Sequence, residues 1–396
     1  MKQSSDSGRS NAHTLPSPAN MFYIGIYKYS SNTKPAALMN PDQREILFWH
    51  PLADNRIQCD LCPHYCSLKE GQRGVCYVRG NTNGQMQLHT YGRSSGFCID
   101  PIEKKPLNHY LPGTPVLSFG TAGCNLTCKF CQNWDISKAR NMDHLCNAAT
   151  PEQLAITAKK HACRAIAFTY NDPVIFFEYA EDVAAACKAT NMKSIAVTAG
   201  YISDAARARF FSSFDAVNID LKAFTDHFYR HICGAKLTTV LDTLIYLKHE
   251  TTVWFEITTL LIPEKNDSDA EIEALSRWIS KNLGQNVPLH FSAFHPDWKM
   301  QDIPKTPLTT LLRARDIALK NGVRYVYIGN AHHPQASSTF CHNCKALLIE
   351  RDGYQLGHWN IHDGRCGQCN TLTPGYFENT PGNWGPKRQL VKINSR

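Results

Sequence analysis

Three cysteines in the first third of the chain have a spacing that could hold an iron–sulfur cluster. Cys124, Cys128 and Cys131, called the cysteine triad below, form a Cys-x-x-x-Cys-x-x-Cys set. Three thiolates can ligate three irons of a [4Fe–4S] cubane and leave the fourth iron open. Among 16 cysteines in 396 residues, chance would give this double spacing with a probability of roughly 0.03. The triad therefore favours a reactive cluster over a buried core set or a zinc knuckle.

Two groups of four cysteines flank the triad. The C-terminal group has two Cys-x-x-Cys pairs, the spacing of a zinc ribbon, and four thiolates are what a tetrahedral zinc site requires. Its members are Cys341, Cys344, Cys366 and Cys369. The N-terminal group lies in a glycine-containing, loop-rich segment and comprises Cys59, Cys62, Cys66 and Cys76. All-sulfur ligation suits both zinc and an auxiliary iron–sulfur cluster, so both stay open there, with zinc slightly favoured.

The elements that must position the triad follow a strand–helix alternation after Pro115. Short apolar runs predict buried strands at 116–120, 165–170, 194–198, 216–221, 253–261, 289–294 and 325–329. Helical patterns lie between them at 151–161, 174–190, 203–214, 237–250, 268–283 and 308–321. This alternation predicts a parallel α/β fold. An open barrel of six or seven units fits better than a closed one of eight, and a doubly wound sheet stays open as an alternative.

The triad begins where the first of these predicted strands ends. Catalytic groups of α/β barrels gather at the carboxyl ends of the strands. The position of the triad along the chain therefore suits an active site.

The composition excludes several other classes of protein. With 43% hydrophobic and 19% charged residues, the chain reads as soluble and globular. It has no run of about 18 apolar residues and no basic region followed by an apolar stretch at its start, so we expect neither a membrane span nor a secretory signal but a cytoplasmic protein. The net charge of +8 comes without a long Lys/Arg run, so nucleic acid is not an expected partner.

Several longer sequence motifs around the triad resemble those of one known group of enzymes. The Cys-x-x-x-Cys-x-aromatic-Cys pattern is similar to the signature of radical S-adenosylmethionine (SAM) enzymes. Further phrases look like the AmmeMemoRadiSam-system radical enzymes, relatives of pyruvate formate-lyase activating enzymes, over roughly residues 47–380. These phrases are Cys62-Pro-His, Asp100-Pro-Ile-Glu-Lys-Lys-Pro-Leu, Cys131-Gln-Asn-Trp, Phe168-Thr-Tyr-Asn-Asp-Pro and Asp220-Leu-Lys-Ala-Phe.

The resemblance implies both a fold and a chemistry. It implies a partial (β/α)6 barrel over residues 116–335, preceded by a flexible extension (1–45) and an N-terminal cysteine-rich module (46–115) and followed by a zinc-ribbon-like module (336–396). The open iron would chelate the amino and carboxylate groups of SAM, whose reductive cleavage yields a 5′-deoxyadenosyl radical that abstracts hydrogen from a substrate. A flavodoxin- or ferredoxin-type electron donor is implied, and a protein substrate or Memo-like and AMME-type partners are suggested.

Roles for single residues follow where the motifs match. Phe130 is expected to contact the adenine of SAM. Asn171 and Asp172 stand where relatives carry a Gly-Gly-Glu-Pro-like motif that contacts the methionine amino group, although Asp is one methylene shorter than Glu. Thr198 opens a Thr-Ala-Gly run where similar enzymes carry Thr-Asn-Gly, so Ala199 cannot supply the side-chain amide.

Other polar residues at strand ends are candidates for the cofactor or the substrate. Asp220 and Lys222 lie two residues apart and so face the same side. A buried pair of this kind is costly unless its members satisfy each other or hold a ligand, which favours a cofactor or substrate role. The same reasoning applies to later strand ends, where the candidates are Glu256, Thr258, His290, His295, Asn330 and His332.

Three functions stay open at this point. The leading one is a radical SAM enzyme that acts on an unidentified substrate. The second is an activase that installs a glycyl radical on a partner enzyme. The third is a non-catalytic interaction protein held together by zinc, which the two flanking cysteine groups would explain.

Overall fold

The structure is a computed structural model that describes residues 44–139, 145 and 147–393. The flexible extension predicted over residues 1–45 therefore lies almost wholly outside the described residues. No helix within these ranges is long and apolar enough to cross a membrane.

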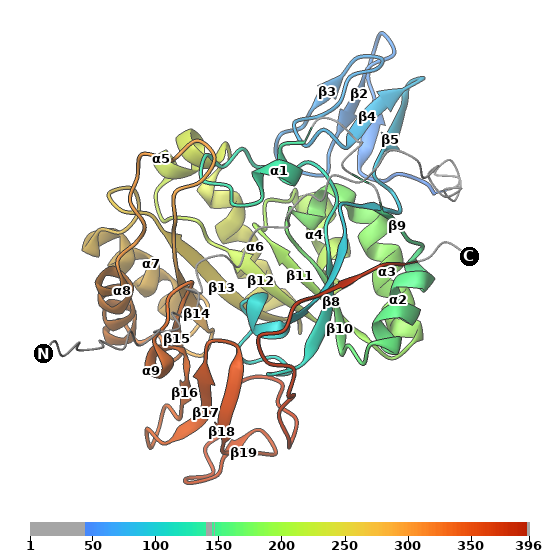
Figure 1. The fold of residues 1–396 in the computed structure, drawn as a ribbon. Helices are drawn as coiled ribbons and strands as arrows, with labels where there is room; N and C mark the ends of the chain where they lie inside the picture. Colours follow the sequence, from blue (N-terminus) through green and yellow to red (C-terminus); the bar gives the residue numbers. More distant parts are fainter. Residues whose placement is uncertain (1–43, 140–144, 146, 394–396) are drawn as a thin grey trace, which may run out of the picture.

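A nine-stranded sheet forms the body of the molecule (Figure 1). Seven strands are parallel and pair in chain order: β8 (Pro115–Phe119), β10 (Ala165–Phe168), β11 (Lys193–Thr198), β12 (Ala216–Asp220), β13 (Trp254–Leu261), β14 (Leu289–Ala293) and β15 (Val326–Gly329). A doubly wound sheet reverses its strand order at a switch point, so this sequential order excludes that alternative. Strands β8 and β15 do not pair with each other in the described chain, and the predicted open α/β barrel is confirmed.

The connections between the parallel strands are helical, as predicted. The main helices are α2 (Pro151–Lys160), α3 (Phe177–Ala189), α4 (Asp204–Phe211), α6 (Leu237–Glu250), α7 (Asp269–Asn282) and α8 (Leu308–Lys320). Helix α7 buries Ile272, Leu275 and Ile279 along one stripe, the spacing that sets an amphipathic helix against a sheet. At its start Ser268 accepts a hydrogen bond from the backbone N–H of Glu271, a cap that satisfies one free donor of the first turn.

Shorter helices complete the body. They are the 3-10 helices η2 (Ile102–Lys104) and η4 (Pro173–Phe176), α1 (Trp134–Ser137), α5 (Asp226–Phe228) with the π-helix η5 (Tyr229–Cys233), and α9 (Pro334–Ser337). Gly234 ends η5 with φ +67°, a left-handed conformation that glycine adopts without steric cost.

Two antiparallel strands extend the sheet beyond β8. Strand β7 (Phe97–Pro101) pairs with β8, and β21 (Gln389–Val391) pairs with β7. Neither strand is among those predicted. Figure 1 shows β21, from the C-terminal end of the chain, crossing beside the opening of the barrel. Segments from both flanking modules therefore share a sheet with the barrel.

The two flanking modules are small and rich in β-structure. In the N-terminal module, β1 (Trp49–Pro51), β2 (Ile57–Cys59) and β3 (Ser67–Leu68) form one sheet, β4 (Arg79–Thr82) and β5 (Gln85–Leu88) a hairpin, and β6 (Arg93–Ser94) pairs with β9 (Asn147–Ala148). In the C-terminal module, β16 (Thr339–Phe340), β17 (Leu347–Asp352) and β18 (Gln355–Trp359) form a sheet, and β19 (Ile361–His362) pairs with β20 (Arg365–Cys366).

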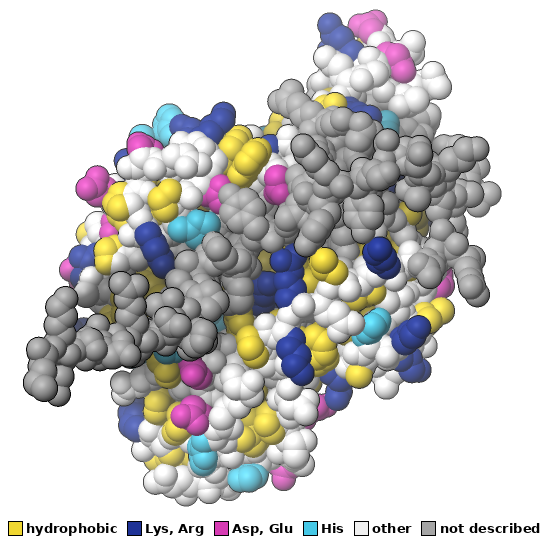
Figure 2. All heavy atoms as spheres, in the orientation of Figure 1, with side chains coloured by type: hydrophobic (Ala, Val, Ile, Leu, Met, Phe, Trp, Pro, Cys, Tyr) yellow, Lys and Arg dark blue, Asp and Glu magenta, His cyan; other side chains and the backbone are white. Residues whose placement is uncertain are grey.

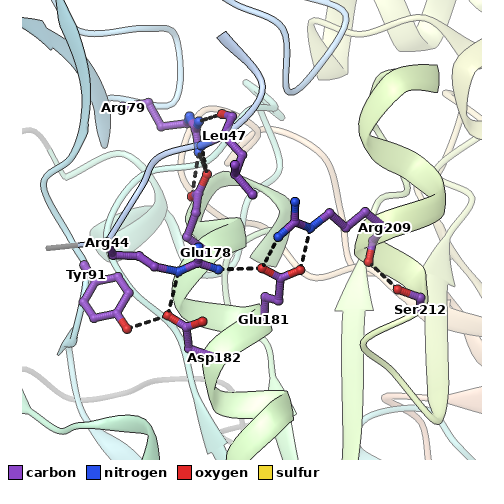
Figure 3. Close-up of polar contacts among 9 residues, drawn as sticks. All are labelled: Arg44, Leu47, Arg79, Tyr91, Glu178, Glu181, Asp182, Arg209 and Ser212. Carbon is purple, nitrogen blue, oxygen red and sulfur yellow. Dashed lines mark hydrogen bonds and ion pairs between the residues drawn. The ribbon is translucent and has the colours of Figure 1, made fainter.

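Charged side chains on α3 hold the N-terminal region against the barrel (Figure 3). Arg44 donates hydrogen bonds to Glu181 at 2.6 Å and to Asp182 at 3.0 Å. The hydroxyl of Tyr91 donates to Asp182 at 2.7 Å. Because all these acceptors lie on one helix, the cysteine-rich segment has a fixed position relative to the barrel.

Charged side chains are scattered over the face shown in Figure 2. On the described part of that face, Lys and Arg stand singly or in small groups among acidic, apolar and neutral residues. Such mixing is typical of a solvated protein surface.

Candidate active site

A cavity of about 480 Å³ opens at the carboxyl ends of the parallel strands. Its volume lies in the range of cofactor and substrate sites. Members of the predicted set that line it are Cys124, Cys128, Phe130, Cys131, Asn171, Asp172, Thr198, Asp220, Lys222, Thr258, His290, His295, Asn330 and His332. The structure therefore brings residues from all seven parallel strands or the loops that follow them to one space.

The cysteine triad lies on the loop that follows β8. Gly123 has φ +79°, and a Cβ atom there would lie 2.0 Å from the Cys76 carbonyl oxygen, so only glycine lets the N-terminal module pack against this loop. The loop also hydrogen-bonds to η5, because Thr127 N donates to the Cys233 carbonyl at 2.8 Å. Contacts on two sides thus fix the loop before any metal binds.

The three thiols have different electrostatic surroundings. Burial raises the pKa of Cys124 to about 12. A hydrogen bond with Cys233 lowers the pKa of Cys128 to about 7, and the positive charges of Lys222 and Lys138 act in the same direction. These two lysines would also offset the charge of thiolate ligands in the cavity. Cys233 is a site residue that the sequence analysis missed.

The thiols of the triad are not packed as closely as those of the C-terminal group. Within the described residues, the C-terminal group alone has three or more Cys, His or acidic ligand atoms all within 4.8 Å of one another. Three separate thiolates are what a [4Fe–4S] cluster with one open iron requires. All three thiols nevertheless face the cavity, and the residues present fit a [4Fe–4S] cluster.

Asn171 holds the backbone in front of the triad. Its Oδ1 accepts from Thr121 N at 3.1 Å, and its Nδ2 donates to the Gly123 carbonyl at 2.8 Å. The side chain thus joins the end of β10 to the cysteine loop.

Asp172 joins two neighbouring strand ends. Its Oδ1 accepts from Thr198 Oγ1 at 2.8 Å, and its Oδ2 accepts from Ala199 N at 2.9 Å. Both carboxylate oxygens are therefore engaged by the end of β11. Asp172 shapes the floor of the cavity through this turn, whose glycine, Gly200, has φ +65°.

Asp220 and Lys222 satisfy each other. The distance from Lys222 Nζ to Asp220 Oδ2 is 2.6 Å. Burial alone would lower the pKa of Lys222, but the negative charges of Asp220 and Cys128 together raise it. The lysine is therefore a permanent cation beside the triad.

Phe130 is buried, faces the cavity and packs at 5.9 Å between ring centroids against Phe228.

The candidates on later strands include a buried pair, Glu256 and His290, and an exposed residue, His332. Glu256 is fully buried and accepts hydrogen bonds from His290 at 2.7 Å and from the backbone of Asn108 and His109. His290 faces the cavity, so this carboxylate fixes the orientation of its ring. By contrast, His332 pairs with Asp352 at an exposed position.

The four C-terminal cysteines lie close enough together to hold one metal ion. The Sγ–Sγ distances are 3.6 Å for Cys341 and Cys369 and 3.7 Å for Cys344 and Cys366. Four sulfurs at about 2.3 Å from a tetrahedral zinc ion lie about 3.8 Å apart. The distances therefore fit four thiolates around one tetrahedrally coordinated metal ion.

The N-terminal cysteines line a separate, smaller cavity. Its volume is about 20 Å³, the size of a single water molecule or ion. It is lined by Cys59, Cys62, Cys66 and Cys76 and by Asn125 of the triad loop. The two cysteine groups are thus neighbours in space.

Comparison with known proteins identifies the family. The model of the radical SAM superfamily matches residues 119–275, which run from the end of β8 to the middle of α7 and contain the triad. The uncharacterized protein MJ0808 of Methanocaldococcus jannaschii is 40% identical over 328 residues, which cover 82% of this chain and 97% of that protein.

Two solved structures show a more distant similarity to this chain. Streptococcus suis SuiB bound to its precursor peptide SuiA has 14% identity and a TM-score of 0.44, with 59% of this chain and 52% of that chain covered. A domain of the pyruvate-formate lyase-activating enzyme from Bacteroides vulgatus has 15% identity and a TM-score of 0.37, with 41% and 97% covered. By its family match and its near-full-length relative, this chain belongs to the radical SAM superfamily.

Proposed function

We propose that this protein binds a [4Fe–4S] cluster on Cys124, Cys128 and Cys131 and cleaves SAM to start a radical reaction on a small substrate. The observation that carries the proposal is the position of the three thiols. They face a cavity at the carboxyl end of the barrel while the remaining wall carries polar residues from the other strands. A ligand on the open iron would therefore extend into the space where a substrate fits.

The cluster, when bound, supplies the electron that splits SAM into methionine and a 5′-deoxyadenosyl radical, which takes a hydrogen atom from the substrate. The protein holds and shields these groups. Asn171 and Asp172 fix the cysteine loop and the β11 turn through their hydrogen bonds. Lys222 offsets the negative charge of the thiolates. Phe130 offers an apolar ring for the adenine.

The subfamily and the partners are proposed from the sequence motifs described above. We place the protein in the AmmeMemoRadiSam-system branch, with a flavodoxin- or ferredoxin-type electron donor and Memo-like or AMME-type partners. We assign zinc to Cys341, Cys344, Cys366 and Cys369, supported by their Sγ–Sγ distances. None of the fifteen described cysteines forms a disulfide, which suits the reducing cytoplasm.

Anaerobic reconstitution tests the proposal. The full chain is loaded with iron and sulfide, reduced with dithionite and given SAM, and 5′-deoxyadenosine is measured by chromatography. We expect release by the wild type and none by the Cys124/Cys128/Cys131→Ala variant. Cys163→Ala, at a buried cysteine that does not line the cavity, is the matched control and should behave as wild type. A wild-type protein that contains zinc but binds no iron would support the non-catalytic alternative instead.

A further inference from the structure

Arg351, on β17 of the C-terminal module, is a buried cation without an acidic partner. Its side chain is 1% exposed. Its Nη1 donates to Thr339 Oγ1 and its Nη2 to the Asn108 carbonyl, each at 2.7 Å. A longer bond runs from Nη1 to the Ser337 carbonyl at 3.5 Å. All three acceptors are neutral, Nε has no hydrogen-bond partner, and no carboxylate of the described chain lies within 4.0 Å of the guanidinium. A buried charge left in this state is costly.

Arg351 lines the same cavity as the triad. Arg351 acts electrostatically on Glu103 of η2, which faces the cavity too. One oxygen of Glu103 accepts from Gly113 N at 2.7 Å, and the other is buried without a partner. Burial raises the pKa of Glu103, while the positive charge of Arg351 acts in the opposite direction.

The cavity wall as a whole carries an excess of positive charge. Its basic residues are Lys104, Lys105, Lys138, Lys222, Lys305, Arg351 and Arg388, against the acidic residues Glu103, Asp172 and Asp220. The two lysines on η2 and beside it, Lys104 and Lys105, share the single carboxylate of Asp100. That cluster therefore keeps one positive charge close to the hairpin that bears Arg351.

We propose that this part of the cavity binds an oxyanion group of the substrate, a carboxylate or a phosphate, and that Arg351 is its anchor. The Nε–H of Arg351 can donate to an oxyanion without breaking any of the three hydrogen bonds that the Nη atoms make. Charge-assisted bonds of this type are stronger than neutral ones. The assignment of this group to a substrate rests on the proposed function, whereas the anion site itself does not.

The C-terminal module is then part of the active site rather than an appendage. Strand β17 begins three residues after Cys344 and continues into the turn that carries Gly353 and Tyr354, which also line the cavity. The four-cysteine site holds the base of this sheet, since Cys341 directly follows β16. The module thus delivers a cation to the cavity that the barrel strands do not supply.

Calorimetric titration of the reconstituted full chain with inorganic phosphate, and separately with acetate, tests the site. SAM is present at saturation throughout. We expect at least one anion to bind saturably, with Arg351→Gln weakening it about 10- to 100-fold and Arg351→Lys weakening it less. The control, Arg324→Gln, changes an exposed arginine outside the cavity and should bind as wild type. Phosphate binding alone points to a phosphorylated substrate and acetate binding alone to a carboxylate.

Three results would overturn the proposal. They are no saturable binding of either anion, equal affinity in wild type and Arg351→Gln, or anion binding that appears only in a parallel titration without SAM, which would mean that the anion occupies the SAM site. Since Arg351 also supports its hairpin, hydrogen exchange on the wild type gives a readout that needs no variant. Phosphate or acetate should slow amide exchange in residues 347–359, and unchanged exchange there would count against the site.

Calorimetry does not depend on turnover, so the two proposals fail separately. A protein that binds phosphate through Arg351 but releases no 5′-deoxyadenosine refutes the proposed function and keeps the anion site. A protein that cleaves SAM but binds neither anion refutes the anion site and keeps the proposed function.

Discussion

Arg79 and Glu178 form a buried ion pair between the N-terminal module and helix α3 (Figure 3). Arg79 Nη1 lies 2.8 Å from one carboxylate oxygen and 3.0 Å from the other, and the two side chains are 1% and 0% exposed. The backbone of Leu47 completes the arrangement, because its N–H donates to Glu178 and its carbonyl accepts from Arg79. Helix α3 follows Asp172 by only one turn of η4, so the pair ties the N-terminal cysteines to the cavity floor.

Removing one member of this pair should destabilise the protein strongly. We expect Arg79→Met to lower the free energy of unfolding by about 3–5 kcal/mol, because Glu178 is left as an uncompensated buried charge. The double variant Arg79→Met/Glu178→Leu should lose less unfolding free energy than the single variant, because it leaves no unpaired buried charge. Urea unfolding of the apoprotein measures both.

An exposed pair provides the comparison. Arg277 and Glu273 are paired at 2.9 Å with side chains 68% and 44% exposed, so Arg277→Met should cost less than about 1 kcal/mol. If Arg79→Met cost no more than Arg277→Met, the buried pair would not anchor the module.

Asp172 should act on SAM through the β11 turn. The variant Asp172→Asn keeps the shape of the side chain but can accept through one oxygen only, so it loses the bond from either Thr198 or Ala199. We expect SAM to bind about tenfold more weakly, which corresponds to one lost charge-assisted hydrogen bond. Equilibrium dialysis of reconstituted protein against SAM measures this. Asp242→Asn, at an exposed acid on α6, should leave the affinity unchanged, and an equal loss in both variants would contradict the assignment.

The sequence predicted the barrel well because its signals are local. Each parallel strand is a short apolar run bounded by polar or glycine residues, and each helix has its own apolar stripe, as with Ile272, Leu275 and Ile279 on α7. The triad was equally readable, since its three ligands lie within eight consecutive residues. Elements of this kind can be predicted without knowing what packs against them.

The parts that could not be predicted depend on contacts between distant segments. Cys233 touches Cys128 from more than a hundred residues away, and nothing near it in the chain marks that contact. Arg351 bonds to the carbonyl of Asn108, 243 residues earlier. Strand β21 has only three residues, and both β7 and β21 are defined by antiparallel pairing with neighbours that lie far away in the chain or in another module. In each case the information lies in the tertiary arrangement and not in a local pattern.

Loss of the C-terminal thiolates should remove one zinc ion and spare the iron. We expect Cys366→Ser/Cys369→Ser to contain one zinc per chain less than wild type, with unchanged iron after reconstitution, because the C-terminal group and the triad bind metal independently. Metal analysis by plasma mass spectrometry gives both contents. The variant should also unfold at a lower temperature, since metal binding contributes directly to the stability of such small modules. Equal zinc in both proteins would rule out this site.

His109 should make the protein sensitive to mild acid. Its ring is buried, with Nδ1 2.6 Å from the Pro374 carbonyl and Nε2 2.5 Å from the hydroxyl of Tyr327. The carbonyl can only accept, so the neutral ring donates from Nδ1 and accepts at Nε2. Burial lowers the pKa of His109 to about 4 from an ordinary value of 6.5. A proton added at Nε2 would meet the donor hydrogen of Tyr327.

The direction of the pH effect follows from this lowered pKa. Between pH 6.5 and 4 the unfolded chain binds a proton at His109 and the folded chain does not, so stability is full above pH 6.5 and falls as the pH drops toward 4. The expected loss from this residue is about 3 kcal/mol. Urea unfolding at pH 7, 5.5 and 4 should show a smaller decline in the free energy of unfolding for His109→Asn than for wild type. Metal loss in acid affects both proteins, so the difference between them reports on His109. Parallel declines in the two proteins would mean that His109 is protonated in the folded state and that its bond from Tyr327 is not maintained.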